Sequence, residues 1–238
     1  MLEIRDLHVS YAKIEAVRGV SASAAPGRIT LLLGANGAGK TTTLRAAMGL
    51  LPVRSGQVVL DGRPITGHPT HRIVRDGLVL VPEGRQVFAP LTVEENLVLG
   101  GYTAGRDRAA EAMARVYEMF PILRERRNGP AGLLSGGEQQ MLAFGRALMS
   151  TPRAMMLDEP SMGLAPTMVE SVLGAVRAIA DSGIALLMVE QNADMGLEIA
   201  DDVVVVARGE VVFSGPAEQA RRNTSVVRAF LGEAALES

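Results

Sequence analysis

The chain has 238 residues, of which 47% are hydrophobic and 3% aromatic, with no Trp, no Cys and a formal net charge of −2. This length allows one large domain or two small ones, and the near-neutral charge, without a basic run at either end, argues against nucleic acid as the main partner. The lack of cysteine excludes disulfides and thiol chemistry, and no apolar run reaches the roughly 20 residues that span a bilayer. We therefore expect a cytoplasmic protein that is not inserted in a membrane.

The first third of the chain predicts short strands punctuated by turns at Pro26-Gly27 and Asp61-Gly62. The expected strands are Leu2–Val9, Ile14–Val20, Arg28–Leu33 and Gln57–Leu60. A helical stretch around His71–Asp76 and an apolar strand at Leu78–Val81 follow. This pattern predicts an antiparallel β portion in the N-terminal part of the chain.

A glycine-rich loop, Gly34–Thr41, follows the apolar run Ile29–Leu33 and matches the pattern G-x-x-x-x-G-K-S/T. Between a strand and a helix this pattern binds phosphate. The following helical pattern begins near Lys40 and is expected to place one apolar face over Leu44, Ala47, Met48 and Leu51. The residues predicted to contact a nucleotide here are Gly34, Asn36, Gly37, Ala38, Gly39, Lys40, Thr41 and Thr42.

The chemistry of this loop indicates a nucleoside triphosphate. Glycines let backbone N–H groups converge on an anion, and the helix start adds the positive end of its dipole. Lys40 and Lys13 are the only two lysines of the chain. Lys40 would reach the β- and γ-phosphates, and the Thr41 hydroxyl would bind Mg²⁺. The loop alone leaves the identity of the base open.

The middle of the chain predicts helices, and the last third alternates strands with helices. The expected helices of the middle region are Val93–Leu99, Arg108–Phe120 and Glu138–Met149, with a break at Gly129-Pro130. The later elements are strands at Ala154–Leu157, Ile184–Val189, Val203–Ala207 and Val211–Phe213 and helices at Thr167–Ser182 and Asn192–Ala200. Apolar strands that alternate with helices predict an α/β fold with a mostly parallel sheet covered on both faces. We expect one domain over residues 1–238, with a helical insertion over roughly residues 84–151.

Two adjacent carboxylates, Asp158 and Glu159, end the apolar run Ala154–Leu157. A carboxylate at the end of a buried strand is costly unless it is paired or binds a metal. Beside a phosphate-binding loop, Asp158 would hold Mg²⁺ and Glu159 would orient or deprotonate an attacking water.

The segment Leu134–Gln140 has the sequence LSGGEQQ and opens a helical pattern. Its Ser135, Gly136 and Gly137 offer a hydroxyl, a freely turning backbone and a helix start, which suit an anion. Lying between a phosphate loop and an Asp-Glu strand end, this segment resembles the signature of ATP-binding-cassette (ABC) ATPases. The resemblance covers essentially the whole chain and implies that the nucleotide is ATP, bound with Mg²⁺.

Within that family the chain most resembles the LivF type, the smaller ATP-binding subunit of bacterial importers for branched-chain and other hydrophobic amino acids. The segments that carry this likeness are Val81–Arg85, Leu91–Leu97, Ser161–Pro166 and Val189–Ala193. The likeness implies an ATP-hydrolysing motor subunit, peripheral on the inner face of the cell membrane through transmembrane permease subunits. In the complete importer it implies pairing with a paralogous ATP-binding subunit, and in isolation a homodimer or a monomer.

The resemblance also implies roles for single residues. Tyr11 matches the aromatic residue that stacks on adenine. Ser135, Gly136 and Gly137 would contact the γ-phosphate of a nucleotide held by the loop of another subunit, because family members pair head to tail around two ATP molecules. Around Val87–Leu91, the helical insertion would grip a short cytoplasmic helix of the permease.

Three positions depart from the general ABC pattern. Glu83 replaces a Gln that usually helps to bind Mg²⁺, and a carboxylate can still reach a metal. Gln191 replaces a His, and a glutamine donates a hydrogen bond to a phosphate but carries no proton near neutral pH. Ala165 stands where an Asp is frequent. The Glu and Gln are typical of the LivF type, yet they predict a chemically weaker site.

Three alternatives stay open at the sequence level. Gln191 and Glu83 are compatible with a subunit that clamps ATP and leaves fast hydrolysis to its partner. The same machine could carry urea, short amides or aromatic acids, because the cargo pocket lies in other polypeptides. A non-transport ABC ATPase serving DNA repair or the ribosome is disfavoured by the single cassette and the near-neutral charge.

Overall fold

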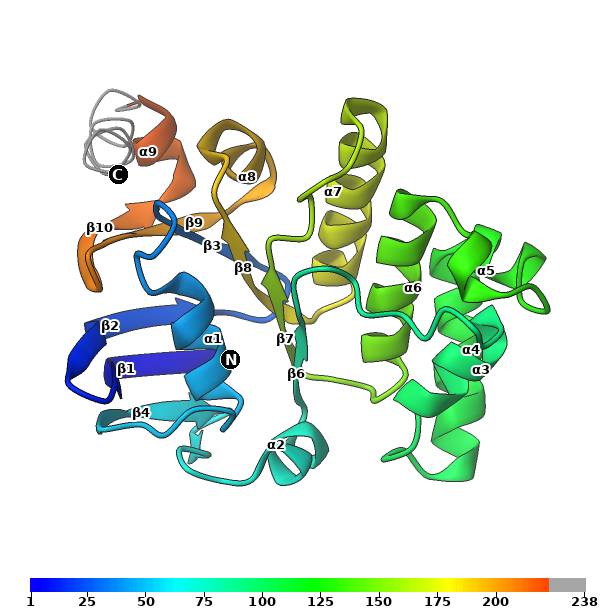
Figure 1. The fold of residues 1–238 in the computed structure, drawn as a ribbon, viewed down its shortest axis with the longest axis horizontal. Coiled ribbons are helices and arrows are strands. Elements are labelled where there is room, and N and C mark those ends of the chain that lie inside the picture. The colour runs from blue at the N-terminus through cyan, green and yellow to red at the C-terminus, as the bar shows by residue number, and fades with distance from the viewer. Residues whose placement is uncertain (223–238) are drawn as a thin grey trace.

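The computed structural model describes residues 1–222, which form two β-sheets surrounded by helices (Figure 1). The strands are β1 (Leu2–Tyr11), β2 (Ile14–Ala24), β3 (Ile29–Leu33), β4 (Ser55–Leu60), β5 (Arg63–Pro64), β6 (Leu78–Val81), β7 (Ala154–Asp158), β8 (Ala185–Glu190), β9 (Asp202–Ala207) and β10 (Glu210–Pro216). The helices are α1 (Lys40–Ala47), α2 (Thr70–Asp76), α3 (Val93–Gly100), α4 (Arg106–Met119), α5 (Pro121–Glu125), α6 (Gly136–Leu148), α7 (Pro166–Asp181), α8 (Ala193–Ile199) and α9 (Ala217–Arg222), with a 3₁₀ turn, η1, at Ala131–Leu133.

The central sheet has six strands in the order β10-β9-β3-β8-β7-β6. All neighbours are parallel except β10, which pairs antiparallel with β9. Every residue of β3, β7 and β8 is buried, which explains why their sequences are continuous apolar runs and do not alternate. The predicted fold, a mostly parallel core sheet with an antiparallel N-terminal portion, is confirmed.

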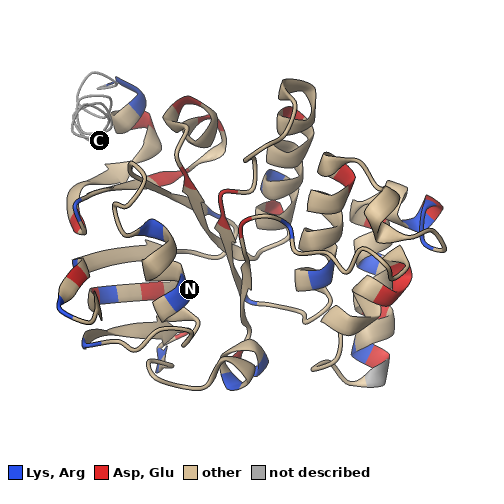
Figure 2. Ribbon diagram, in the orientation of Figure 1, with Lys and Arg blue, Asp and Glu red and all other residues tan. Residues whose placement is uncertain are grey.

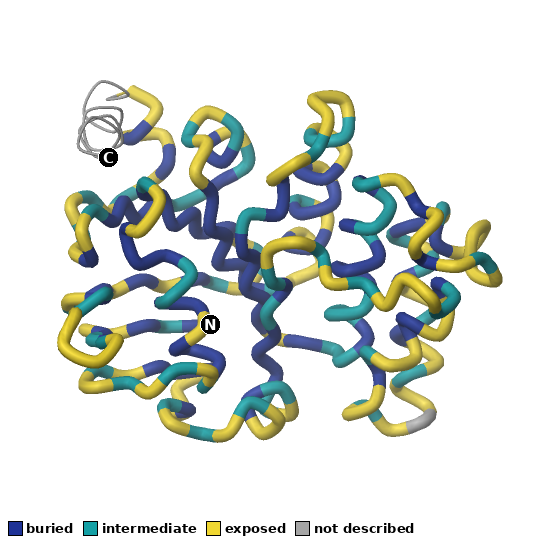
Figure 3. The backbone as a smooth tube through the Cα atoms, in the orientation of Figure 1, coloured by how far each residue is buried: buried dark blue, intermediate teal, exposed yellow. Residues whose placement is uncertain are grey.

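Alternate residues of the central strands pack into two hydrophobic clusters. Leu31 and Leu33 face a cluster built with α6, α7 and α8, whereas Leu32 faces a cluster built with α1 and the second sheet. The second sheet is four-stranded and antiparallel, in the order β2-β1-β4-β5. The central strands are therefore the most deeply buried part of the chain, as the dark tube in the middle of Figure 3 shows.

Several elements differ from the expected ones. Helix α1 ends at Ala47, so Met48 and Leu51 lie beyond it and the predicted four-residue helical face is wrong. Gly49 ends this turn because its φ is +69° and a Cβ there would lie 2.4 Å from the carbonyl oxygen of His68. Strand β2 continues past Val20 to Ala24 because its pairing with β1 continues to Leu2. The short elements β5, α5 and α9 and the turn η1 were not expected.

Because β3, β6, β7 and β8 are parallel, their carboxyl ends meet at one edge of the sheet. The loop Gly34–Thr42 follows β3, Glu83 follows β6, Asp158 ends β7 and Glu190 ends β8. Acidic residues consequently gather at this end of the central strands (Figure 2). Within residues 1–222 no helix combines the length and the apolar character that crossing a bilayer requires.

Candidate nucleotide site

The loop between β3 and α1 has a backbone that depends on its glycines. Gly37 has a φ of +78°, and Gly39, the residue before α1, has a φ of +101°. A Cβ at Gly39 would lie 2.6 Å from the carbonyl oxygen of Ala16, and one at Gly34 would lie 2.4 Å from that of Val206. These positions therefore exclude larger side chains and let the loop fold tightly at the start of the helix.

Lys40 begins α1 and is buried, with 5% of its surface exposed. Its ammonium donates to the carbonyl oxygens of Gly34, at 2.8 Å, and Ala35, at 3.1 Å. The same Nζ lies 3.6 Å from Oε1 of Glu159. A compact positive charge is thus held inside the loop and directed toward the end of β7.

Thr41 and Asp158 place two oxygen atoms side by side. The Thr41 hydroxyl donates to Oδ1 of Asp158 at 2.9 Å, and Asp158 is 3% exposed. Burial raises the pKa of Asp158, and the charges of Glu159 and Glu83 raise it further, while the Thr41 hydrogen bond lowers it. A hydroxyl beside a carboxylate is a donor pair that suits a hard cation.

A cavity of about 430 Å³ lies over the glycine loop and brings together site residues from five separate segments. This volume falls in the range of small-ligand pockets. The lining residues are Tyr11, Ala16, Asn36, Gly37, Gly39, Lys40, Thr41, Thr42, Glu83, Glu159, Met162 and Gln191. Of the predicted residues, this lining lacks Gly34, Ala38 and Asp158 as well as the Ser-Gly-Gly segment 135–137, and Asp158 instead lines the larger hollow described below.

The rim and wall of the cavity hold three of the predicted residues that are far apart in sequence. Tyr11 is 45% exposed, and its hydroxyl oxygen lies 3.4 Å from Oγ1 of Thr42. Gln191 follows β8, and none of the chain's three histidines is among the lining residues. Glu159 has a left-handed backbone, with a φ of +49°, and its N–H donates to the carbonyl oxygen of Val189 at 3.0 Å.

The structure adds one buried carboxylate that the sequence reasoning did not assign. Glu190 ends β8, is 3% exposed, and accepts hydrogen bonds from the N–H of Ser161, at 3.2 Å, and its Oγ, at 2.7 Å. Burial raises the pKa of Glu190, while the bonds from Ser161 lower it. The sequence pattern that could have predicted Glu190 is an acidic residue at the end of an apolar run, the same pattern that predicted a role for Asp158.

The Ser-Gly-Gly segment lies away from this cavity. Ser135 precedes α6 and forms a capping box with Glu138: its Oγ accepts from the Glu138 N–H at 3.3 Å, and its own N–H donates to the Glu138 carboxylate at 2.6 Å. Gly136 and Gly137 are the first residues of the helix, and a Cβ at Gly137 would lie 2.0 Å from the terminal methyl of Met168. None of the three lines the cavity over the glycine loop.

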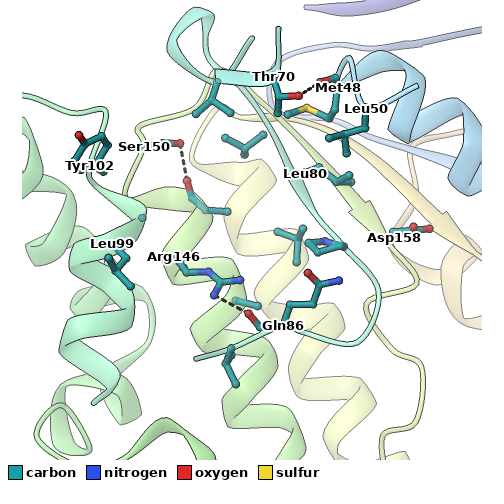
Figure 4. A pocket seen from close by; sticks show the side chains of 18 of the residues that line it. Met48, Leu50, Thr70, Leu80, Gln86, Leu99, Tyr102, Arg146, Ser150 and Asp158 are labelled. Atoms are coloured by element: carbon teal, nitrogen blue, oxygen red, sulfur yellow. Dashed lines mark hydrogen bonds between the residues drawn. The ribbon is translucent and has the colours of Figure 1, made fainter. Parts of the chain in front are cut away.

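A second, larger hollow of about 1010 Å³ lies on the other side of the loop that follows β6 (Figure 4). We call it the groove. Its exposed apolar side chains are Leu50, Phe88, Leu99 and Tyr102, and Val87, Gln86, Arg45 and Arg146 also line it. Of the predicted apolar run Val87–Leu91, only Val87 and Phe88 belong to the lining, and the rest of the wall comes from other elements.

A family profile described as "ABC transporter" matches residues 17–162. The chain is 42% identical to the high-affinity branched-chain amino acid transport ATP-binding protein BraG of Pseudomonas aeruginosa over 98% of this chain and 100% of that protein. It is 37% identical to the probable branched-chain amino acid transport ATP-binding protein LivF of Archaeoglobus fulgidus over 92% of this chain and 93% of that protein.

Solved structures show the same architecture. An ATP-binding cassette of an ABC transporter in its ADP conformation matches with a TM-score of 0.87 and 26% identity, over 98% of each chain. A nucleotide-free ATP-binding cassette matches with a TM-score of 0.84 and 26% identity, over 94% of each chain. The likeness extends over nearly the whole chain.

Proposed function

The chain belongs to the ABC transporter family, and from that premise we propose that it is the ATP-binding and ATP-hydrolysing motor subunit of a membrane importer for branched-chain or other hydrophobic amino acids. The observation that carries the ATPase role is the single cavity that brings together Lys40, Thr41, Glu159 and Gln191. The proposed cargo class rests on the relatives, which are named as ATP-binding proteins of branched-chain amino acid transport.

Each residue of the cavity has a task in this proposal. Lys40 neutralises charge on the β- and γ-phosphates, and the backbone N–H groups of the loop cradle them. Glu159 orients the attacking water and accepts its proton. Gln191 donates a hydrogen bond to the γ-phosphate, and Tyr11 offers its flat face to adenine.

The residues present fit a magnesium ion. Thr41 Oγ1 and Asp158 Oδ1 are 2.9 Å apart, and Glu83 lines the same cavity. Among residues 1–222 no three His, Cys, Asp or Glu side chains form a metal cluster by themselves, so the remaining ligands would be phosphate oxygens and water, as Mg²⁺ prefers. The ion would supply positive charge to the phosphates, in addition to the charge of Lys40.

A second subunit is needed to complete this site. Ser135, Gly136 and Gly137 present a hydroxyl and a helix start, yet they do not line the cavity of their own chain. We propose that they face the γ-phosphate held by another ATP-binding subunit, a paralogue in the complete importer or a second copy of this chain in isolation.

The groove is the proposed docking surface for a permease subunit. Its exposed apolar side chains suit the apolar face of a short helix. The subunit would then sit at the inner face of the cell membrane, held there by the permease.

Replacing Glu159 with Gln tests the ATPase role. The variant keeps the size of the side chain and removes its basicity, so we expect hydrolysis to fall by about 10²-fold or more while ATP affinity stays within a few-fold. Phosphate release and equilibrium binding of ATP measure the two quantities on the purified chain and on the chain with its permease and partner subunit.

The same comparison decides the alternative in which this subunit clamps ATP without fast hydrolysis. Gln191 favours that alternative, because a glutamine cannot relay a proton. Equal hydrolysis by the native chain and by Glu159→Gln, alone and in the complex, would establish the clamp. Uptake of labelled leucine, isoleucine and valine by the reconstituted importer tests the cargo class, with urea as the competing substrate.

A further inference from the structure

A separate cavity of about 260 Å³, which we call the amino-end cavity, lies at the other end of the central strands. Pro152 lies just before β7 and Ile184 just before β8, whereas the nucleotide cavity lies at the carboxyl ends of these strands. The five residues of β7 separate the two levels by roughly 17 Å. The amino-end cavity shares no lining residue with the nucleotide cavity or with the groove.

The walls of the amino-end cavity are mainly aliphatic. One face of α4 and the last residue of α6 meet there with the segments that lead into β7 and β8, because residues 112, 116 and 119 recur at the spacing of a single helix face. The lining residues are Ala112, Arg115, Val116, Met119, Leu148, Thr151, Pro152, Ser182 and Ile184. Such walls bury an aliphatic chain, and a few polar groups among them decide which end group it carries.

The charge at the rim of the amino-end cavity is positive and unopposed. Arg115 is exposed, is the only charged residue among the described lining residues, and forms no hydrogen bond or ion pair with a described residue. Asp181, next to the lining residue Ser182, already pairs with Arg177 at 2.9 Å. The guanidinium is therefore free to take a carboxylate in the two-point geometry that arginine favours.

Thr151 supplies a second polar group. Its backbone is left-handed, with a φ of +52°, at the end of α6, where a β-branched residue is disfavoured. Its N–H donates to the carbonyl oxygen of Leu148 at 2.9 Å, while its hydroxyl has no hydrogen-bond partner among the described residues. The strained turn thus places an uncommitted hydroxyl on the same cavity as Arg115.

We propose that the amino-end cavity binds a small branched aliphatic carboxylate, with its carboxylate on Arg115 and Thr151 and its chain against the aliphatic walls. The cavity is smaller than the roughly 300–1,000 Å³ of sites for drug-sized ligands, which excludes nucleotides and long fatty acids. The inference rests on the proposed function only for the source of the ligand. A subunit that drives import of branched-chain amino acids meets leucine, and the 2-oxo acid formed from it, on the side where the imported amino acid is released.

Isothermal titration of the native chain without nucleotide tests this site. Leucine, 4-methyl-2-oxopentanoate and 4-methylpentanoate share the chain and the carboxylate, and we expect at least one of them to bind with a Kd on the order of 0.1 mM. The amine 3-methylbutylamine lacks the carboxylate and acetate lacks the chain, so neither should bind measurably. Tighter binding of leucine identifies the amino acid as the source, and tighter binding of the oxo acid identifies its transamination product.

Substitutions assign the binding to this cavity. Arg115→Met keeps an unbranched stem and removes the charge, so we expect carboxylate affinity to fall by about tenfold or more, and Arg115→Lys should recover part of it. Thr151→Val keeps the shape of the side chain and removes the hydroxyl, so affinity should fall several-fold. Arg108→Met is the matched control, because Arg108 is an exposed arginine of the same helix that does not line the cavity.

The outcomes are separable from those of the proposed function. The inference is overturned if no carboxylate binds the native chain at about 10 mM, or if Arg115→Met and Arg108→Met weaken binding equally. Melting temperatures of the variants close to that of the native chain show that a loss of binding is not a loss of fold. Equilibrium dialysis of ATP on the same preparation tests the proposed function: a chain that binds the carboxylate but not ATP refutes that function and leaves this site in place.

Discussion

At the scale of single residues, two buried carboxylates end neighbouring strands of the central sheet and have different partners. Asp158 accepts from the Thr41 hydroxyl, and Glu190 accepts from the backbone and side chain of Ser161. Neither carboxylate forms a salt bridge in the described part of the chain, and burial raises the pKa of both. Asp158 lies where a metal would offset its charge, whereas Glu190 depends on neutral donors alone.

The raised pKa of Glu190 predicts a pH-dependent cost to stability. The folded state binds this proton more tightly than the unfolded state, so the contribution of Glu190 is fully present below about pH 4.5 and declines as pH rises from there through the folded pKa. Glu190→Gln retains an acceptor for Ser161 and loses the charge. We expect the free energy of unfolding of this variant, relative to the native chain, to rise over that window by on the order of 1 kcal/mol.

Urea unfolding of both proteins between pH 4.5 and 8 measures this difference, and subtraction removes the other titrating groups. Ser161→Ala is the matched control: it removes one donor to the carboxylate, so stability should fall more steeply with rising pH. A difference between Glu190→Gln and the native chain that stays constant with pH would contradict the assignment.

The sequence predicted the site residues that belong to recognisable local motifs, and the resemblance to ABC ATPases predicted Tyr11, Glu83 and Gln191, which line the same cavity. The glycine loop and Lys40 form one contiguous motif, and Asp158 and Glu159 end one strand. Glu190 and Ser161 are 29 residues apart. Nothing in the local pattern at Arg115 distinguishes it from a solvated helix residue, so its place on one cavity with Thr151 emerged only from the folded chain.

At the scale of elements, α3 and α6 approach closely at Gly100, the last residue of α3. A Cβ there would lie 2.1 Å from the carbonyl oxygen and 2.9 Å from the carbonyl carbon of Arg146. These atoms are backbone and cannot rotate away. The separation of the two helices is therefore set by the absence of a side chain at this position.

We predict that Gly100→Ala destabilises the chain by about 1–3 kcal/mol, because α3 and α6 must move apart. Gly174→Ala is the matched control in α7: the position is exposed, and apart from the adjoining backbone of α7 no described atom lies within 4 Å of the added Cβ. It should stabilise by up to about 1 kcal/mol through helix propensity. Thermal and urea melts measure both changes, and equal effects of the two substitutions would contradict the packing argument.

Element boundaries were less predictable than element types. The predicted ranges of the buried strands β3, β7 and β8 nearly match the observed strands, because a continuous apolar run makes up almost the whole of each strand. The end of β2 at Ala24 depends on pairing with β1, and the end of α1 depends on the approach of His68 to Gly49. Both are contacts between distant segments, which local periodicity does not contain.

At the scale of the whole molecule, the chain carries two parts that do not meet in one site: the nucleotide cavity and the Ser-Gly-Gly segment. Its cavity holds the glycine loop with Glu159, and its Ser-Gly-Gly helix start lies elsewhere. Under the proposed function each part is completed by another subunit. Nucleotide binding by one chain and pairing of two chains should therefore be separable by substitution.

Gly136→Asp provides that separation. A Cβ at Gly136 would meet Leu164 Cδ2 at 3.1 Å and Arg85 Nη1 at 3.3 Å, both ends of flexible side chains, so we expect the fold to accommodate it. The added carboxylate would repel the γ-phosphate of the facing subunit. We predict ATP affinity of the single chain within about twofold of native and a loss of at least tenfold in ATP-dependent pairing.

Sedimentation velocity in the Glu159→Gln background, with ATP and Mg²⁺, measures the pairing. Gly136→Ala adds bulk without charge and is the control for size. Undiminished pairing of Gly136→Asp would show that the Ser-Gly-Gly segment does not face the nucleotide of a second chain.

The position of Lys40 has a consequence for the order of events in the cavity. Its ammonium lies 3.6 Å from the Glu159 carboxylate while it donates to two carbonyl oxygens of its own loop. A phosphate that takes this ammonium weakens the hold on Glu159, since one positive charge is then shared between two anions. Phosphate binding in the cavity therefore weakens the interaction that holds Glu159, the residue proposed to activate water. Glu159 then becomes available for this role only after the nucleotide has bound to Lys40.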